Sequence, residues 1–198
     1  MDVDDPAVDD IYHVGTIACV KQVLRLPGGN VRLLVEGKSR AVLRAVTQEE
    51  PYFVGALDEV LEQGTPVSIE TDALLRTAHH YFEEYCKMSG RISGETMQSV
   101  LEIEDPGQLA DIIAANVLSK IEDRQQVLEE FDELARLESV CALLVRETEL
   151  AGVEKKVQAR VRKQIEQNQK DYFLREQIKA IQTELGDKDG TDVEELRE

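Results

Sequence analysis

A long helical pattern in the last quarter of the chain most constrains its fold. Residues 150–185 contain no proline, and their only glycine is Gly152. Apolar or aromatic side chains recur there mostly every three or four residues, a spacing typical of one face of an α-helix. This stripe comprises Leu150, Val153, Val157, Val161, Ile165, Tyr172, Ile178, Ile181 and Leu185. Such a helix would run for about 50 Å, longer than a small domain is wide. We therefore expect it to project and to pack its stripe against a partner helix.

The same segment reverses the charge of the chain. Residues 1–150 carry 13 basic and 29 acidic side chains, whereas residues 151–180 carry 8 basic and 4 acidic ones. The basic patch comprises Lys155, Lys156, Arg160, Arg162 and Lys163. Its simplest interpretation is the solvated face of a long helix, and the alternative is attraction to an acidic surface or to nucleic-acid phosphates. The net charge of −17 argues against nucleic acid as the main partner.

Alternating apolar residues predict a small sheet in the N-terminal part. We expect four strands, near residues 11–20, 31–36, 40–46 and 52–61, with the sequence Leu-Pro-Gly-Gly-Asn at 26–30 as a hairpin turn. Four short strands make a thin sheet, so an unpaired edge and exposed apolar faces are expected.

Shorter helices are predicted between the sheet and the long helix. A helix over 71–88 would place Leu74, Ala78, Phe82 and Tyr85 on one face. A second, over 105–117, has Asp105 as N-cap and proline in its first turn. A third is expected from a Ser119 cap to residue 128. The last begins at Asp132 and continues with little or no break through Gly152, since one glycine costs only about 1 kcal/mol.

Residue patterns that carry catalysis or bind metals are not found. The sequence has no Gly-x-x-x-x-Gly-Lys-Ser/Thr loop for nucleotide phosphates and no Gly-x-Ser-x-Gly nucleophile motif. The adjacent histidines His79 and His80 would diverge on a helix, as would adjacent acidic pairs. Cys19, Cys86 and Cys141 are far apart in the sequence and are interpreted as core or partly buried thiols in a reducing cytoplasm. No catalytic, cofactor-binding or metal-binding residue is therefore expected, and no run is apolar enough to span a membrane.

Several segments, in order, carry a family resemblance. They are DYFLREQIKAIQTELG at 171–186, VGTIACVKQVLRLPGGNVRLLVEGKSRA at 14–41, EEPYF at 49–53 and DPGQLADIIAANV at 105–117. Together they span about residues 9–186, and they resemble the N-terminal region of Lon-family ATP-dependent proteases. That resemblance implies a chain without the family's ATPase module and Ser–Lys protease domain, and without the first strands of its β-rich subdomain.

An α+β fold follows, with a small, incomplete β-rich subdomain, a helical subdomain and a long projecting C-terminal helix. The expected parts are residues 1–64 (β-rich), 65–131 (helical), 132–186 (long helix with a coiled-coil-like stripe) and 187–198 (acidic flexible tail). The resemblance implies a non-catalytic substrate-recognition and assembly role in the cytoplasm. It also implies that ATP and Mg²⁺ are used by the full-length protease and not by this region.

The partners implied by the resemblance are unfolded or degron-bearing proteins. Self-association is expected to be weak for this region alone, with a homohexamer in the full-length family. Nucleic-acid binding by the basic patch is the alternative, and no membrane partner is expected. Tyr52 and Phe53, beside Pro51, are candidate substrate contacts. Packing of these two rings between the sheet and the helices is the competing interpretation.

Overall fold

The computed structural model describes residues 6–61, 64–66 and 68–195, with side chains as far as Glu184. The chain divides into two compact units, Met1–Thr148 and Glu149–Glu198. The first unit holds a short 3₁₀ helix at Val8–Asp10, the sheet, four helices and the start of a fifth. The second consists, in its described part, of the remainder of that fifth helix. This α+β composition confirms the predicted fold class, whereas the four-part division of the chain stays a prediction.

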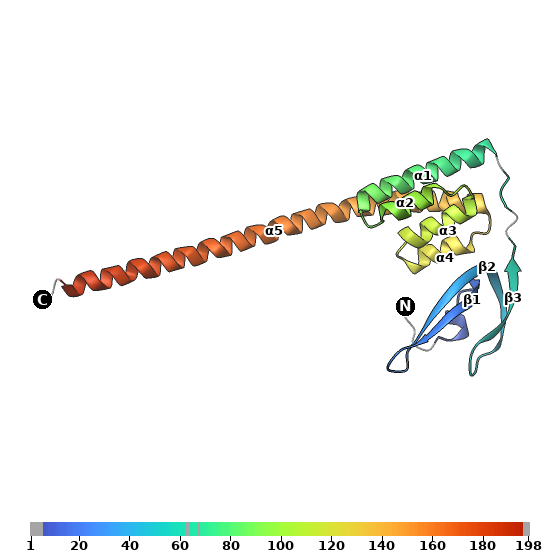
Figure 1. Cartoon of the computed structure of the whole chain (residues 1–198), viewed down its shortest axis with the longest axis horizontal. Helices are drawn as coiled ribbons and strands as arrows, with labels where there is room; N and C mark the ends of the chain where they lie inside the picture. The colour runs from blue at the N-terminus through green and yellow to red at the C-terminus, as the bar shows by residue number, and fades with distance from the viewer. Residues whose placement is uncertain (1–5, 62–63, 67, 196–198) are drawn as a thin grey trace. The chain divides into compact units, whose positions relative to one another are not determined.

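The sheet has three antiparallel strands in the order β1-β2-β3 (Figure 1). They are β1 (Val14–Arg25), β2 (Val31–Gln48) and β3 (Val54–Val60). The prediction of four strands was wrong, because the segments 31–36 and 40–46 form one continuous strand. Lys38 is an extra residue in β2 at this point: Ile17 pairs with Ser39 and Ala18 with Gly37. Such a bulge absorbs one residue without ending the pairing.

The turn between β1 and β2 forms where the sequence predicted it. Gly28 and Gly29 have φ values of 89° and 84°, a region that residues with a Cβ seldom adopt. The Leu26 amide donates to the Asn30 carbonyl oxygen at 2.8 Å and closes the turn. The hairpin prediction is therefore confirmed, although β1 begins later and ends later than expected.

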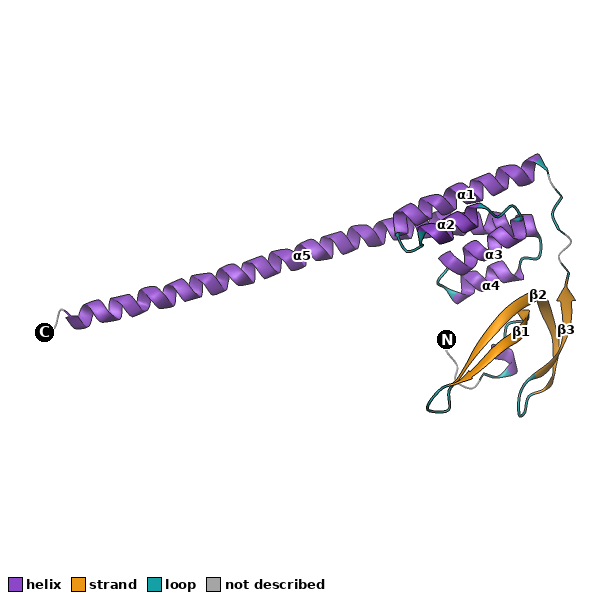
Figure 2. Cartoon of the chain, in the orientation of Figure 1, coloured by secondary structure: helices purple, strands orange, loops and turns teal. Residues whose placement is uncertain are grey.

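Five α-helices follow the sheet within the described residues (Figure 2). They are α1 (Ile69–Ser89), α2 (Gly94–Leu101), α3 (Pro106–Val117), α4 (Ile121–Glu129) and α5 (Glu133–Glu195). The first four and the start of α5 share one apolar core. Its most buried members include Ala78, Phe82, Val100, Leu109, Ile113, Val127, Leu137, Val140 and Leu144. The predicted face of α1, with Ala78, Phe82 and Tyr85 buried and Leu74 packed against the core, is therefore confirmed. Helix α2 is one that the sequence patterns had not located.

Helix starts follow side-chain capping with one exception. The Asp105 carboxylate accepts from the Gln108 amide at 2.7 Å, and Asp132 accepts from the Ala135 amide at 2.8 Å. Both caps confirm the predicted helix starts. The predicted Ser119 cap was wrong, because α4 starts one residue later with Lys120 at the N-cap and no side-chain cap.

The long helix is continuous. It passes through Gly152 without a break, as predicted, and its backbone remains helical beyond Gly186 to Glu195. It therefore includes most of the segment expected to be an acidic tail, whose flexibility stays a prediction. The stripe residue Leu185 lies outside the described side chains.

The three cysteines differ in their exposure to solvent. Cys86 and Cys141 are buried in the helical core, whereas Cys19 is exposed on β1, so the expectation of a core or partly buried thiol was wrong for Cys19. Burial raises the pKa of Cys141 to about 11, with a further contribution from the nearby Glu138 carboxylate. Burial also raises the pKa of Cys86.

We predict that a thiol reagent at pH 8 modifies Cys19 rapidly and the other two cysteines only on unfolding. With a pKa near 11, about one Cys141 side chain in a thousand is a thiolate at that pH. Mass spectrometry of the labelled chain, with and without denaturant, measures this. Rapid labelling of Cys141 in the native protein would contradict the burial described above.

The close pairing of β2 with β3 at Gly55 can be tested by substitution. A Cβ at Gly55 would lie 2.6 Å from Leu43 Cδ1 and 3.2 Å from the Ala45 carbonyl oxygen. We expect Gly55→Ala to lower the free energy of unfolding by about 1 kcal/mol in urea titrations, because the Leu43 side chain can turn away but the Ala45 carbonyl oxygen must shift. Gly15→Ala is the matched control, because a Cβ there has no atom within 4 Å. Equal changes in the two variants would argue against this pairing of the two strands.

Candidate functional site

One face of the sheet carries an apolar strip. Cross-strand partners share a face, so the pairs Val20–Val35, Val23–Leu33 and Arg25–Val31 point to the same side of the hairpin. Lys21 is an extra residue in β1, which keeps Val20 and Val23 on one side. The strip comprises Val20, Val23, Val31, Leu33 and Val35, each between 52% and 55% exposed. The β1–β2 hairpin thus presents a row of apolar side chains to solvent.

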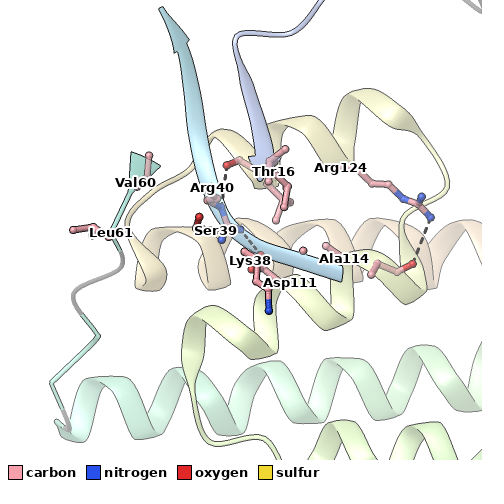
Figure 3. A pocket seen from close by; sticks show the side chains of 13 residues that line it. Thr16, Lys38, Ser39, Arg40, Val60, Leu61, Asp111, Ala114 and Arg124 are labelled. Atoms are coloured by element: carbon pink, nitrogen blue, oxygen red, sulfur yellow. Dashed lines mark hydrogen bonds and ion pairs between the residues drawn. The ribbon is translucent and has the colours of Figure 1, made fainter. Parts of the chain in front are cut away.

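The same face of the sheet leads from the strip to a pocket beside the helices. Figure 3 shows this pocket, which Thr16, Arg40 and Asp111 line. Along β1, Thr16, Ala18 and Val20 alternate onto one side, and Thr16 and its partner Arg40 line the pocket. The pocket has a volume of about 670 Å³. Its other lining residues include Val60 from β3, Asp111 and Ala114 from α3, and Arg124 and Leu128 from α4. An apolar chain lying on the strip would therefore meet a pocket with mixed walls at its end.

A charged network joins the sheet to the helices at this pocket. Arg40 Nη2 lies 2.5 Å from Asp111 Oδ1, and its Nε donates to the Leu128 carbonyl oxygen at 3.2 Å. Arg136 on α5 donates from Nη1 to Asp111 Oδ2 at 3.1 Å. Arg40 and Arg136 are 8% and 0% exposed, so both guanidinium groups need a counter-charge. Asp111 thereby connects β2, α3 and α5.

A second contact holds the other strand. The Gln125 side-chain amide on α4 donates to the Val14 carbonyl oxygen of β1 at 3.0 Å. Both contacts lie toward the start of β1 and the middle of β2. Toward the tip of the hairpin, Val23, Val31 and Leu33 are all more than half exposed.

The sequence patterns did not predict this network. Asp111 and Arg136 lie inside apolar runs, Leu-Ala-Asp-Ile-Ile and Leu-Ala-Arg-Leu, and Arg40 directly precedes the run Ala-Val-Leu. A charge inside an apolar periodic run signals a buried ion pair, because an unpaired charge cannot be buried. Which charges meet was not readable from spacing, since the three residues come from three separate elements.

The predicted substrate contacts Tyr52 and Phe53 lie in the turn between β2 and β3. They are 67% and 41% exposed. The competing interpretation, that both rings pack between the sheet and the helices, does not fit these exposures. They are also not among the residues that line the pocket. Their role as substrate contacts stays a prediction.

The predicted helix-association stripe is exposed along α5. Its members Val153, Val157, Val161, Ile165, Tyr172, Ile178 and Ile181 are between 48% and 68% exposed. Lys155, Lys156, Arg160, Arg162 and Lys163 of the basic patch are exposed on the same helix. Arg162 Nε lies 3.1 Å from Glu166 Oε1, an exposed pair one turn apart. Neither set contributes to the pocket in the first unit.

Neighbouring cations lower the pKa of two carboxylates, the exposed Glu36 and the partly buried Asp123. The ammonium groups of Lys21 and Lys38, at 2.5 and 3.1 Å, lower the pKa of Glu36. The Arg146 guanidinium at 2.5 Å lowers the pKa of Asp123.

Among the described residues, no group of three or more side chains is arranged to hold a metal ion. No helix in that part of the chain is both long and apolar enough to cross a bilayer.

Comparisons with known proteins agree with this architecture. A family model of the ATP-dependent protease La (LON) substrate-binding domain matches residues 1–146. The Lon protease of Brevibacillus choshinensis is 45% identical over 197 residues, covering 98% of this chain and 25% of that protein. The Lon protease of Bacillus thuringiensis (strain Al Hakam) is 46% identical over 200 residues, covering 100% of this chain and 25% of that protein.

A solved structure shows the same fold. The N-terminal domain of the Mycobacterium avium complex Lon protease aligns with a TM-score of 0.56 and 28% identity, over 73% of this chain and 74% of that one. Fold and comparisons thus place the chain in the class of α+β Lon substrate-binding domains. The chain belongs to the Lon family. It spans about a quarter of the length of the curated relatives that it matches.

We predict that Asp111→Asn lowers the free energy of unfolding by about 1–3 kcal/mol, because it removes the counter-charge of two buried guanidinium groups. The loss is smaller than for a fully buried pair, since Asp111 is 40% exposed and both arginines have further interactions. Asp58→Asn is the control: its pair with Arg44 is exposed on both sides, so about 0–1 kcal/mol is expected. Urea titration compares the two, and an equal loss would exclude a special role for Asp111.

Proposed function

We propose that this chain captures unfolded or degron-bearing polypeptide for a Lon-type ATP-dependent Ser–Lys protease. The observation that carries the proposal is the exposed apolar strip on the β1–β2 hairpin. Exposed apolar patches of this kind are typical of binding surfaces. An unfolded chain offers apolar side chains that a folded protein has already buried, so the strip would distinguish the two states.

The magnitude of the interaction favours reversible capture. Full burial of one aliphatic side chain is worth about 1.5–3 kcal/mol, and the strip residues are already near half buried. Each would then contribute roughly 1 kcal/mol before the costs of association. We expect a micromolar or weaker dissociation constant, which suits a domain that must release its substrate to other parts of the protease. Misfolded proteins and short-lived regulatory proteins would be the substrates, in the cytoplasm.

The long helix supports an assembly role. An apolar stripe exposed along α5 is suited to pairing with helices of other copies, as in coiled coils. Gln164, Asn168 and Arg175 lie on or near the stripe and weaken such a seam. We therefore propose weak self-association of this region alone and a homohexamer in the complete protease, whose ATPase module would use ATP and Mg²⁺.

Nucleic-acid binding is the second candidate, favoured by the exposed cations of the basic patch. It would have a distinct signature. Binding to phosphates falls steeply with salt, whereas apolar capture changes little.

The deciding measurement is fluorescence anisotropy of a labelled, permanently unfolded polypeptide titrated with the chain, with its folded form as control. We expect selective binding of the unfolded form with little salt dependence. Binding to neither form would contradict the capture function. Binding to a labelled DNA duplex that disappears at high salt, without binding to unfolded polypeptide, would favour the nucleic-acid alternative.

A further inference from the structure

The β1–β2 hairpin is a basic region in an acidic chain. Its two strands carry six basic side chains and one acidic side chain, Glu36. The chain as a whole has a net charge of −17. Four of these cations have acidic partners: Lys21 and Lys38 flank Glu36, Arg40 pairs with Asp111, and Arg44 pairs with Asp58. Arg25 and Arg32, near the hairpin tip, are the cations of the two strands that remain to attract negative charge.

Cations lie at both ends of the strip. Arg25 shares the face of Val23 and Val31 at the hairpin tip. Arg124 lines the pocket at the opposite end. Among the described residues Arg25 has no ion-pair partner, and the Arg124 guanidinium donates only to the carbonyl oxygens of Leu118 and Ala115, at 2.6 and 3.4 Å. Carbonyl groups do not neutralise the charge of Arg124.

We infer that the strip selects extended polypeptide segments in which an apolar stretch is flanked by acidic residues. This inference rests on the proposed capture function and specifies its substrate class. The distance along β1 from Thr16 to Arg25 is about 30 Å at 3.3 Å per residue, which an extended segment of about nine residues would span. Carboxylates at the ends of such a segment would reach Arg25 and Arg124, while alternate apolar side chains cover the strip.

A second copy of this chain fits the strip less well. Arg25 at one end and Arg124 at the other mean that two strips packed face to face bring cations together in either direction. Like charges placed opposite each other are destabilising. An acidic and apolar segment meets the strip with complementary charge instead.

The opposite face of the hairpin provides matched controls. Leu34 follows Leu33 directly and is similarly exposed, 59% against 53%, but points to the other side of the sheet. Arg32 pairs with Leu24 on that opposite face, whereas Arg25 pairs with Val31 on the strip. A substitution at Leu33 or Arg25 on the strip can therefore be compared with the same substitution at Leu34 or Arg32 on the opposite face.

The test uses the whole chain and three labelled peptides of about ten residues. They share one alternating apolar centre and carry glutamate, glutamine or lysine at both ends. Anisotropy titrations should give the tightest binding for the glutamate peptide, about three- to tenfold tighter than for the glutamine peptide, and the weakest for the lysine peptide. Equal affinity for all three peptides would overturn the inference.

The variants locate the site. Arg25→Glu should remove the preference for the glutamate peptide, and Leu33→Ser should weaken every peptide by about tenfold. Arg32→Glu and Leu34→Ser should change binding about twofold or less. Val23→Ser is a second test of the strip, should Leu33→Ser alter the circular dichroism spectrum. Equal effects on the two faces would overturn the inference.

The same titrations separate this inference from the proposed function. If the wild-type chain binds no unfolded polypeptide, both fail. If it binds unfolded polypeptide but not according to peptide charge or hairpin face, only the inference fails. Sedimentation velocity completes the test: a dimer that Leu33→Ser dissociates and Leu34→Ser does not would assign the strip to a second copy and overturn the inference.

Discussion

The carboxylate of Asp111 is the contact on which the arrangement of the first unit depends. It accepts from Arg40 on β2 and from Arg136 on α5, and both guanidinium groups are almost fully removed from solvent. Arg40 and Ala41 are the only buried residues of the three strands, so the sheet gains little from burial, and the directional ionic contact helps to fix its position. The bond from Gln125 to the Val14 carbonyl oxygen adds a second point of attachment.

The placement of these contacts explains the exposed strip. They hold the sheet through Arg40 and Val14, whereas Val23, Val31 and Leu33 lie toward the tip of the hairpin on the face that leads to the pocket. One face of the sheet thus carries the Arg40–Asp111 ion pair beside α3 and α4 at one end and exposed apolar side chains at the other. Binding surfaces need exposed apolar side chains of this kind. Here those side chains belong to two strands whose register is set by two bulges.

The long helix separates two roles along one element. Leu137, Val140 and Leu144 complete the core of the first unit, whereas the stripe from Val153 onward is exposed. Continuity through Gly152 means that no loop intervenes between the two parts. Whatever packs on the stripe is therefore connected to the helical core by helix alone.

Local patterns predicted the elements whose formation depends on nearby residues. The α+β class, the turn at Gly28 and Gly29, the Asp105 and Asp132 caps and the continuous helix were all readable from the sequence, because spacing and capping act within a few residues. Tertiary structure decided the rest: the bulge at Lys38 that merges two strands, the exposure of Cys19 and the ion pairs of Asp111. These depend on which surfaces meet, and the partners of Asp111 lie 71 and 25 residues away in the sequence. No local periodicity encodes a contact over that separation.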